Sequence, residues 1–227
     1  MVVLATKLYV DGEAERRAMD SLESLVDDDL AELDVEFTVG LRDDEFPSVT
    51  VTGADATAAR NLLAARWGAV TPHRETGETH VGTLESWDDE GFVLDAGESV
   101  RVPADELGLG RGSPAQVRKR FGLVQHVPLR FREREEGPPR LADEEVDRLY
   151  DWQRGGDHGN GRVNANSATR SEVRATVNKS GHAQDIVTVE RLGLLEMSII
   201  CTPDTDAPGL LSDIGRFLPS ELLAVVP

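Results

Sequence analysis

The sequence predicts an α+β protein in which two ferredoxin-like units flank a small S1/OB-like β-barrel. Strands and amphipathic helices alternate in the first and the last part of the chain, as they do in ferredoxin-like folds. The middle part has short β-rich runs separated by turns, which is typical of a small barrel. Linker-like stretches with Pro and Gly lie between these parts. The expected divisions are residues 1–70, 80–134, a helix with a Gly-rich linker at 141–160, and 161–227.

The first unit reads in the order β-α-β-β-α. Apolar residues between Ala14 and Leu30 recur at helical spacing, with carboxylates on the opposite face. VEFTVGL alternates like a half-buried strand, and Asp55 is the expected N-cap of a second helix. This order makes up most of a ferredoxin-like unit. The expected elements are strands at 2–10, 35–41 and 48–53, and helices at 13–30 and 55–67.

The barrel unit carries an inserted helix before its last strand. Ser113 is the expected N-cap of that helix, Pro114 lies in its first turn, and three cations end it. Along 127–133, apolar residues alternate with arginines, so one face of this strand is apolar and the other basic. A further helix is expected at about 142–153, before a Gly-rich stretch at 154–161.

The last unit shows a complete β-α-β-β-α-β pattern. Thr169 and Glu172 form a capping-box motif, and Asp206 is the expected N-cap of the second helix. Cys201 ends an apolar run and is expected to be buried on the third strand of the unit. Expression of 162–227 alone is expected to give an autonomously folding fragment.

Composition indicates a habitat more than a function. The net charge is −18, and only three of the 24 basic residues are lysine, so 21 are arginine. An acidic, lysine-poor surface suits a cytosol at molar salt, which predicts a halophilic, cytoplasmic protein. No apolar run reaches the roughly 18 residues that a membrane-spanning helix needs, so no membrane partner is expected.

Against this acidity, residues 111–134 carry a net charge of +6. Such a reversal favours contact with phosphates, and at molar salt the contact would rely on bidentate arginine–phosphate bonds and stacking. The alternative is a purely structural role, in which these cations pair with the abundant carboxylates of the chain itself. The predicted nucleic-acid-binding residues, called the basic island below, are Arg111, Arg118, Lys119, Arg120, Arg130 and Arg132.

A resemblance to a known family rests on four segments: GFVLDAG (91–97), RFGLVQHVPLRF (120–131), VERLGLLEMSIIC (189–201) and TDAPGLLSDIG (205–215). On these segments the chain resembles a haloarchaeal member of an uncharacterised archaeal protein family, a domain of unknown function. The resemblance implies no activity. Locally, VGTLESWDDEGFVLDAG is also similar to the opening hairpin of S1-like RNA-binding barrels.

The predicted function is therefore non-enzymatic RNA binding, as an accessory factor in translation or RNA handling, with RNA or a ribonucleoprotein as partner. One alternative is a small-ligand-binding regulatory protein that uses the turn at Asp206, Pro208 and Gly209, which is similar to the D-x-PG-L turn of ACT domains. A protein–protein scaffold is the other. No catalytic residue, metal site or cofactor is predicted, because the histidines are scattered and no phosphate-binding loop or nucleophile motif occurs.

Overall fold

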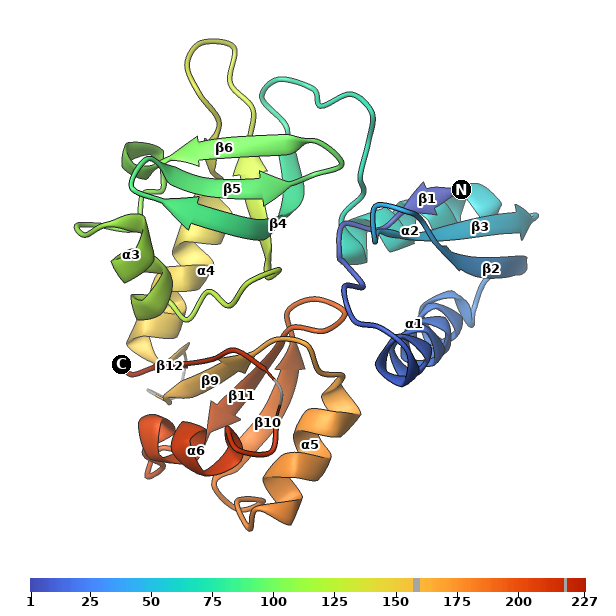
Figure 1. The fold of residues 1–227 in the computed structure, drawn as a ribbon. Coiled ribbons are helices and arrows are strands. Elements are labelled where there is room, and N and C mark those ends of the chain that lie inside the picture. Colours follow the sequence, from blue (N-terminus) through green and yellow to red (C-terminus); the bar gives the residue numbers. More distant parts are fainter. Residues whose placement is uncertain (157–159, 219) are drawn as a thin grey trace.

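The computed structural model describes residues 1–156, 160–218 and 220–227, and it contains three antiparallel sheets (Figure 1). Each sheet belongs to one of three units along the chain, and helices pack on each of them. The predicted α+β class is confirmed. Part of the Gly-rich stretch predicted at 154–161 lies outside the described residues.

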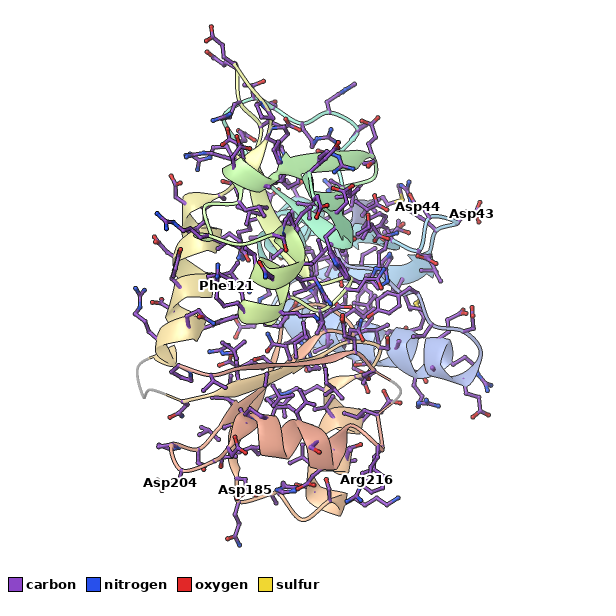
Figure 2. All side chains as sticks on the ribbon, turned by 60° about the vertical axis from the view of Figure 1, so that its left-hand side comes forward. Asp43, Asp44, Phe121, Asp185, Asp204 and Arg216 are labelled. Carbon is purple, nitrogen blue, oxygen red and sulfur yellow. The ribbon has the colours of Figure 1, made fainter. Side chains whose placement is uncertain are left out.

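The N-terminal unit has the predicted element order and a three-stranded sheet in the order β1-β3-β2. Helix α1 buries Ala18, Leu22, Val26 and Leu30, which recur every four residues along one face. Figure 2 shows Asp43 and Asp44 at the tip of the β2–β3 hairpin, away from the other units. The elements are β1 (Val2–Val3), α1 (Glu13–Leu30), β2 (Val35–Leu41), β3 (Pro47–Gly53) and α2 (Ala56–Trp67).

One local prediction for this unit was wrong. The strand expected at 2–10 is only two residues long, because the chain after Leu4 leaves the sheet and carries its side chains to the other units. Asp55 is the N-cap residue of α2, as predicted, but its side chain makes no cap hydrogen bond. Its Oδ2 instead accepts a hydrogen bond from the Asp34 backbone amide at 3.0 Å.

The central unit is a curled, half-barrel sheet of five strands in the order β6-β5-β4-β7-β8 (Figure 1). Its core also contains Leu149 and Trp152 of α4, so the helix predicted at 142–153 packs together with this sheet. Ser113 is the N-cap of α3, as predicted, and the structure adds a capping box with Gln116. The elements are β4 (Thr79–Asp88), β5 (Gly91–Asp95), β6 (Ser99–Pro103), α3 (Pro114–Arg120), β7 (Pro128–Arg132), β8 (Arg140–Leu141) and α4 (Asp143–Arg154).

The C-terminal unit has the antiparallel strand order β10-β11-β9-β12. Both predicted caps are present: the Thr169–Glu172 box starts α5, and the Asp206 side chain accepts the Gly209 amide at the start of α6. Cys201 is buried at the end of β11, as predicted. The elements are β9 (Arg162–Ala165), α5 (Arg170–Lys179), β10 (Ile186–Arg191), β11 (Met197–Cys201), α6 (Ala207–Ile214) and β12 (Leu222–Val225).

The C-terminal sheet is covered on both faces. Its α5 and α6 side holds the apolar core of the unit. Its other side meets the central unit through polar groups and through apolar side chains of β12. Asn164 donates to the Gly122 carbonyl at 2.8 Å, and Asn166 donates to the Gln125 carbonyl at 3.2 Å. Val225 of β12 packs in the core of the central unit. This face of the sheet is therefore an internal interface.

The loop between β10 and β11 joins the C-terminal unit to the N-terminal one. Leu194 and Leu195 at its tip are buried in the hydrophobic core of the N-terminal unit. The Leu194 amide donates to Thr6 Oγ1 at 2.8 Å. All three units are thus in contact. Within the described ranges, no helix is both long and apolar enough to cross a bilayer.

Candidate ligand-binding cleft

The basic island does not form one surface. Arg118 is 4% exposed, and its guanidinium binds Glu221 of the C-terminal unit at 2.5 and 2.9 Å. It also stacks on Trp87, with 3.7 Å between the guanidinium carbon and the ring centroid. Burial and this set of partners make Arg118 an internal link between two units.

The neighbouring island residues Arg111, Lys119 and Arg120 are exposed. The Arg120 guanidinium donates to the carbonyls of Arg111 at 2.8 Å and Leu109 at 2.5 Å, so it holds the loop before α3 in place. Among the described residues, neither Arg111 nor Lys119 forms an ion pair within 4 Å. These two side chains are the free cations at the α3 end of the molecule.

Arg130 and Arg132 lie at the opposite end of β4. Arg132 pairs in register with Thr79, whereas Trp87, the partner of Arg118, lies eight residues further along the same strand. At roughly 3.3 Å per residue, about 25 Å separates the two groups. Arg132 contacts Thr79 Oγ1 at 3.3 Å and Glu144 at 3.9 Å. Arg130 instead faces a cleft.

This cleft lies where the three units meet, and its volume is about 770 Å³. Helices α1 and α2 form one wall and the linker before β4 another, while β7, α4 and the end of β10 complete it. The volume lies within the range of small-molecule pockets, roughly 300–1,000 Å³. Its charged lining residues are Arg66, Arg130, Arg148, Arg191, Asp28, Asp29, Glu75 and Glu78.

The four arginines of the cleft come from four different elements. Arg66 on α2 is paired with Asp29 of α1. Arg130 on β7 and Arg148 on α4 both bind the buried carboxylate of Glu145. Arg191 at the end of β10 forms no ion pair within 4 Å among the described residues, and its guanidinium carbon lies 5.8 Å from the Trp67 ring centroid. Arg191 is exposed to solvent, but partial desolvation by its neighbours lowers its pKa, and the nearby charge of Arg170 lowers it further.

Three aromatic rings line the same cleft, those of Trp67, His73 and His80. Trp67 is half-buried at the end of α2, and its Nε1–H donates to Asp29 at 3.3 Å. The Nε2–H group of His80 donates a hydrogen bond to the Glu75 carbonyl at 3.0 Å. Guanidinium groups, aromatic faces and carboxylates in one cleft can together bind an anion, stack a flat ring and accept hydrogen bonds from its amino groups.

Sequence reasoning found only Arg130 of this set. Long stretches of chain separate the adjacent pair Arg66 and Trp67 from Arg148 and from Arg191. Arg148 and Arg191 each follow an acidic residue directly, so no local excess of charge marks these two. Tertiary packing alone brings the four residues together. Gly193, two residues after Arg191, is typical of a turn between strands, but it does not indicate what the turn contacts.

A second cluster of polar groups lies buried between the units. The Tyr9 hydroxyl donates to Glu196 Oε1 at 2.6 Å and accepts the Ser167 amide at 3.0 Å. The Tyr9 ring stacks on His126 at a centroid distance of 3.9 Å, and His126 Nδ1 lies 3.2 Å from Glu85. These contacts connect the three units.

Lys7 neutralises the acidic side of this cluster. Its ammonium lies 2.8 Å from Asp95, 3.3 Å from Glu85 and 3.5 Å from Glu45. Burial works against the charge, but the hydrogen bond to Asp95 and the two carboxylates of the central unit raise the pKa of Lys7.

Glu196 forms no ion pair within 4 Å in the part of the chain that the structure describes. Its side chain is 0% exposed, and Oε2 has no hydrogen-bond partner among the described residues. Burial raises the pKa of Glu196 to about 8, although the hydrogen bond from Tyr9 opposes the shift. The carboxyl group is therefore mostly neutral at pH 7. It lies behind Gly193 of the cleft, where an added Cβ would be 2.1 Å from Oε2.

The turn at Asp206, Pro208 and Gly209, predicted as an alternative ligand site, lies outside the cleft. Gly209 donates its amide to Asp206 at 3.1 Å, and Pro208 lies in the first turn of α6. Neither these residues nor their neighbours line the cleft. Figure 2 shows Asp204, in the same turn, at the end of the molecule opposite the central unit. The turn acts as a helix cap.

Three domain models of one family match this chain in succession. They are the DUF2110 N-terminal domain over residues 1–73, the DUF2110 central domain over 74–153, and the DUF2110 C-terminal domain over 160–226. These limits place α4 with the central sheet, as the packing does. A search of curated proteins finds no match.

Proposed function

The chain belongs to the DUF2110 family, and we propose that it is a non-enzymatic RNA-binding protein whose main contact surface is the cleft between its three units. The observation that carries the proposal is the convergence of Arg66, Arg130, Arg148 and Arg191 on one cleft in a chain of net charge −18.

The chemistry of the lining matches a nucleotide. Guanidinium groups bind phosphate oxygens in bidentate fashion and stack on bases. An aromatic face such as Trp67 adds about 1–3 kcal/mol for each stacked base. The carboxylates of Asp28, Glu75 and Glu78 can accept hydrogen bonds from base amino groups. A lining with both charge signs favours a few ordered nucleotides over a long polyanion track.

The proposed halophilic cytosol strengthens the case for a cleft. At molar salt the Debye length is about 3 Å, so long-range attraction between an arginine patch and RNA is lost. Short-range hydrogen bonds and stacking are kept, and both need an enclosed surface. The free cations at the α3 end, Arg111 and Lys119, then act at most as secondary phosphate contacts.

Arg191→Glu tests the proposal, because Arg191 is exposed in the cleft and free of ion pairs among the described residues. Binding of short single-stranded RNA would be followed by fluorescence anisotropy. Loss of one charge-assisted contact is expected to weaken binding by about tenfold or more. Arg111→Glu is the matched control, since it makes the same charge change at an exposed position outside the cleft.

Circular dichroism first establishes that both variants are folded. Equal binding by the parent and both variants would exclude the cleft as the RNA site. Loss with Arg111→Glu alone would move the site to the α3 end. No binding by the parent at any salt concentration would end the RNA proposal.

A small ligand in the same cleft is the second candidate, because the volume of the cleft suits one. Mononucleotides and RNA oligomers distinguish the two functions. Equal affinity for both indicates a small-ligand site, whereas affinity that rises with oligomer length indicates an RNA site.

We further assign the C-terminal unit to the ferredoxin-like class. Its β-α-β-β-α-β order and its antiparallel strand order β10-β11-β9-β12 support this assignment. The N-terminal unit has the order β1-β3-β2 and would be a shortened version of the same class. The half-barrel of the central unit supports a distant likeness to S1/OB barrels.

A further inference from the structure

We infer that Arg130 and Arg148, held by Glu145, form a subsite for a single phosphate group in the cleft. The inference deepens the proposed function and rests on it, because it names the group of the RNA or nucleotide that this wall would hold. It concerns two arginines whose charge is only half neutralised within the protein.

The geometry is that of one carboxylate shared by two guanidinium groups. Arg130 Nη1 lies 3.2 Å from Glu145 Oε2, and Arg148 Nε lies 3.2 Å from Glu145 Oε1. A second nitrogen of Arg148 also donates to Oε1. Each carboxylate oxygen therefore holds one arginine, and both arginines line the cleft.

Charge counting shows why an anion is expected there. The Glu145 side chain is 0% exposed, while those of Arg130 and Arg148 are 46% and 28% exposed. A single buried carboxylate cannot balance two cations, so one positive charge remains on the exposed side. Glu144, the preceding carboxylate of α4, accepts a hydrogen bond from Thr79 at 2.9 Å and lies 3.9 Å from Arg132. It forms no pair with Arg130 within 4 Å, although the charge of Arg130 also acts on it.

Packing also limits how far Arg148 can move. Its guanidinium carbon lies 4.8 Å from the Trp152 ring centroid, and that ring packs in the core of the central unit. The other guanidinium of the same stack, Arg162, lies 4.7 Å from the ring. Glu145 and Trp152 thus fix the side chain before any ligand binds. A preformed pair of guanidinium groups avoids much of the ordering cost of binding.

Glu145 is a positioning residue in this scheme, and the sign of its effect is diagnostic. Replacing it by Gln removes a negative charge next to the subsite. Electrostatics alone would then strengthen anion binding. If Glu145 acts by holding the two arginines, Glu145→Gln weakens binding although the site becomes more positive.

The experiment uses the full chain and three probes: AMP, inorganic phosphate and adenosine. Isothermal titration calorimetry at constant ionic strength would measure binding of AMP, competition by inorganic phosphate, and binding of adenosine, which lacks the phosphate group. Arg148→Gln is expected to weaken AMP binding by about tenfold and to leave adenosine binding unchanged.

Arg154→Gln is the matched control, because Arg154 forms the same i, i+3 ion pair with Asp151 on the same helix, outside the cleft. It should leave AMP binding unchanged. Arg130→Gln provides a second test from β7, independent of the stability of α4.

The outcomes separate this inference from the proposed function. RNA binding that is lost in Arg191→Glu but unchanged in both Arg130→Gln and Arg148→Gln overturns the subsite and keeps the proposed function. The opposite result is also possible: the protein binds no RNA, but it binds phosphate and AMP, and this binding needs both arginines. That result keeps the subsite and overturns the proposed function. Stronger AMP binding by Glu145→Gln overturns the positioning role.

Discussion

Replacing Glu196 by Gln should change the pH dependence of stability more than any other single conservative substitution between the units. The carboxyl group is fully buried with one hydrogen bond from Tyr9 and one oxygen without a partner among the described residues. Gln keeps the shape and the acceptor for Tyr9 but cannot ionise. It therefore imitates the neutral acid that the folded protein holds at neutral pH.

The size and the sign follow from the pKa of Glu196. Its ordinary value is 4.5, and burial raises it to about 8 in the folded chain. Between these values the folded state keeps a proton that the unfolded state has lost, so the free energy of unfolding falls as pH rises. The stabilisation that the protonated Glu196 contributes is fully present below about pH 4.5 and is lost above about pH 8. At about 1.4 kcal/mol per pH unit, the change between pH 5 and pH 8 is about 3 kcal/mol.

Urea denaturation of parent and variant at each pH, followed by circular dichroism in a constant concentration of KCl, would measure this change. Subtracting the unfolding free energy of the parent from that of the variant at each pH cancels the contributions of the other titrating groups. The Gln variant should gain about 3 kcal/mol relative to the parent from pH 5 to pH 8. Glu23→Gln, at an exposed position of α1, is the control. Its unfolding free energy relative to the parent should not change with pH. A flat difference for Glu196→Gln as well would refute the reasoning.

Three further predictions concern buried groups. Cys201 should resist thiol reagents at pH 8 until the protein unfolds, because burial raises the pKa of its thiol to about 11; rapid labelling of the native protein would contradict this. Arg118→Met should lower the unfolding free energy by about 3 kcal/mol by leaving Glu221 without its cation, and Glu221→Gln in the same chain should restore part of the loss in a double-mutant cycle. Gly122→Ala should cost more than about 1 kcal/mol in thermal unfolding, because φ is +65° and the new Cβ would lie 2.5 Å from Val225; Gly77→Ala, also at positive φ but with no atom within 4 Å, should cost less.

Local signals in the sequence predicted local structure well. The four-residue spacing in α1, the N-cap at Ser113 and the capping box at Thr169 act within one or two helical turns, so the sequence alone determines them. The chain after Leu4 was misread as a strand because Lys7 and Tyr9 serve contacts with other units. That use of a side chain cannot be seen from its neighbours in sequence.

The candidate site was harder to predict for the same reason. The excess charge over 111–134 was real, but Glu221 neutralises Arg118 from 103 residues away. Arg148 and Arg191 lie in segments with no excess of positive charge. Net charge in a window of sequence measures neither burial nor pairing, so the candidate cleft could be recognised only in the tertiary structure.

The insertion of Leu194 and Leu195 into the N-terminal core has a consequence for synthesis of the protein. The first unit cannot complete its core until the ribosome has made more than 120 further residues. At about 5–20 residues per second, the wait is on the order of ten seconds. During that time the apolar surface meant for the two leucines is open to chaperones and to neighbouring nascent chains. Truncation just before the β10–β11 loop should therefore harm the solubility of the N-terminal unit, although every residue of that unit is present.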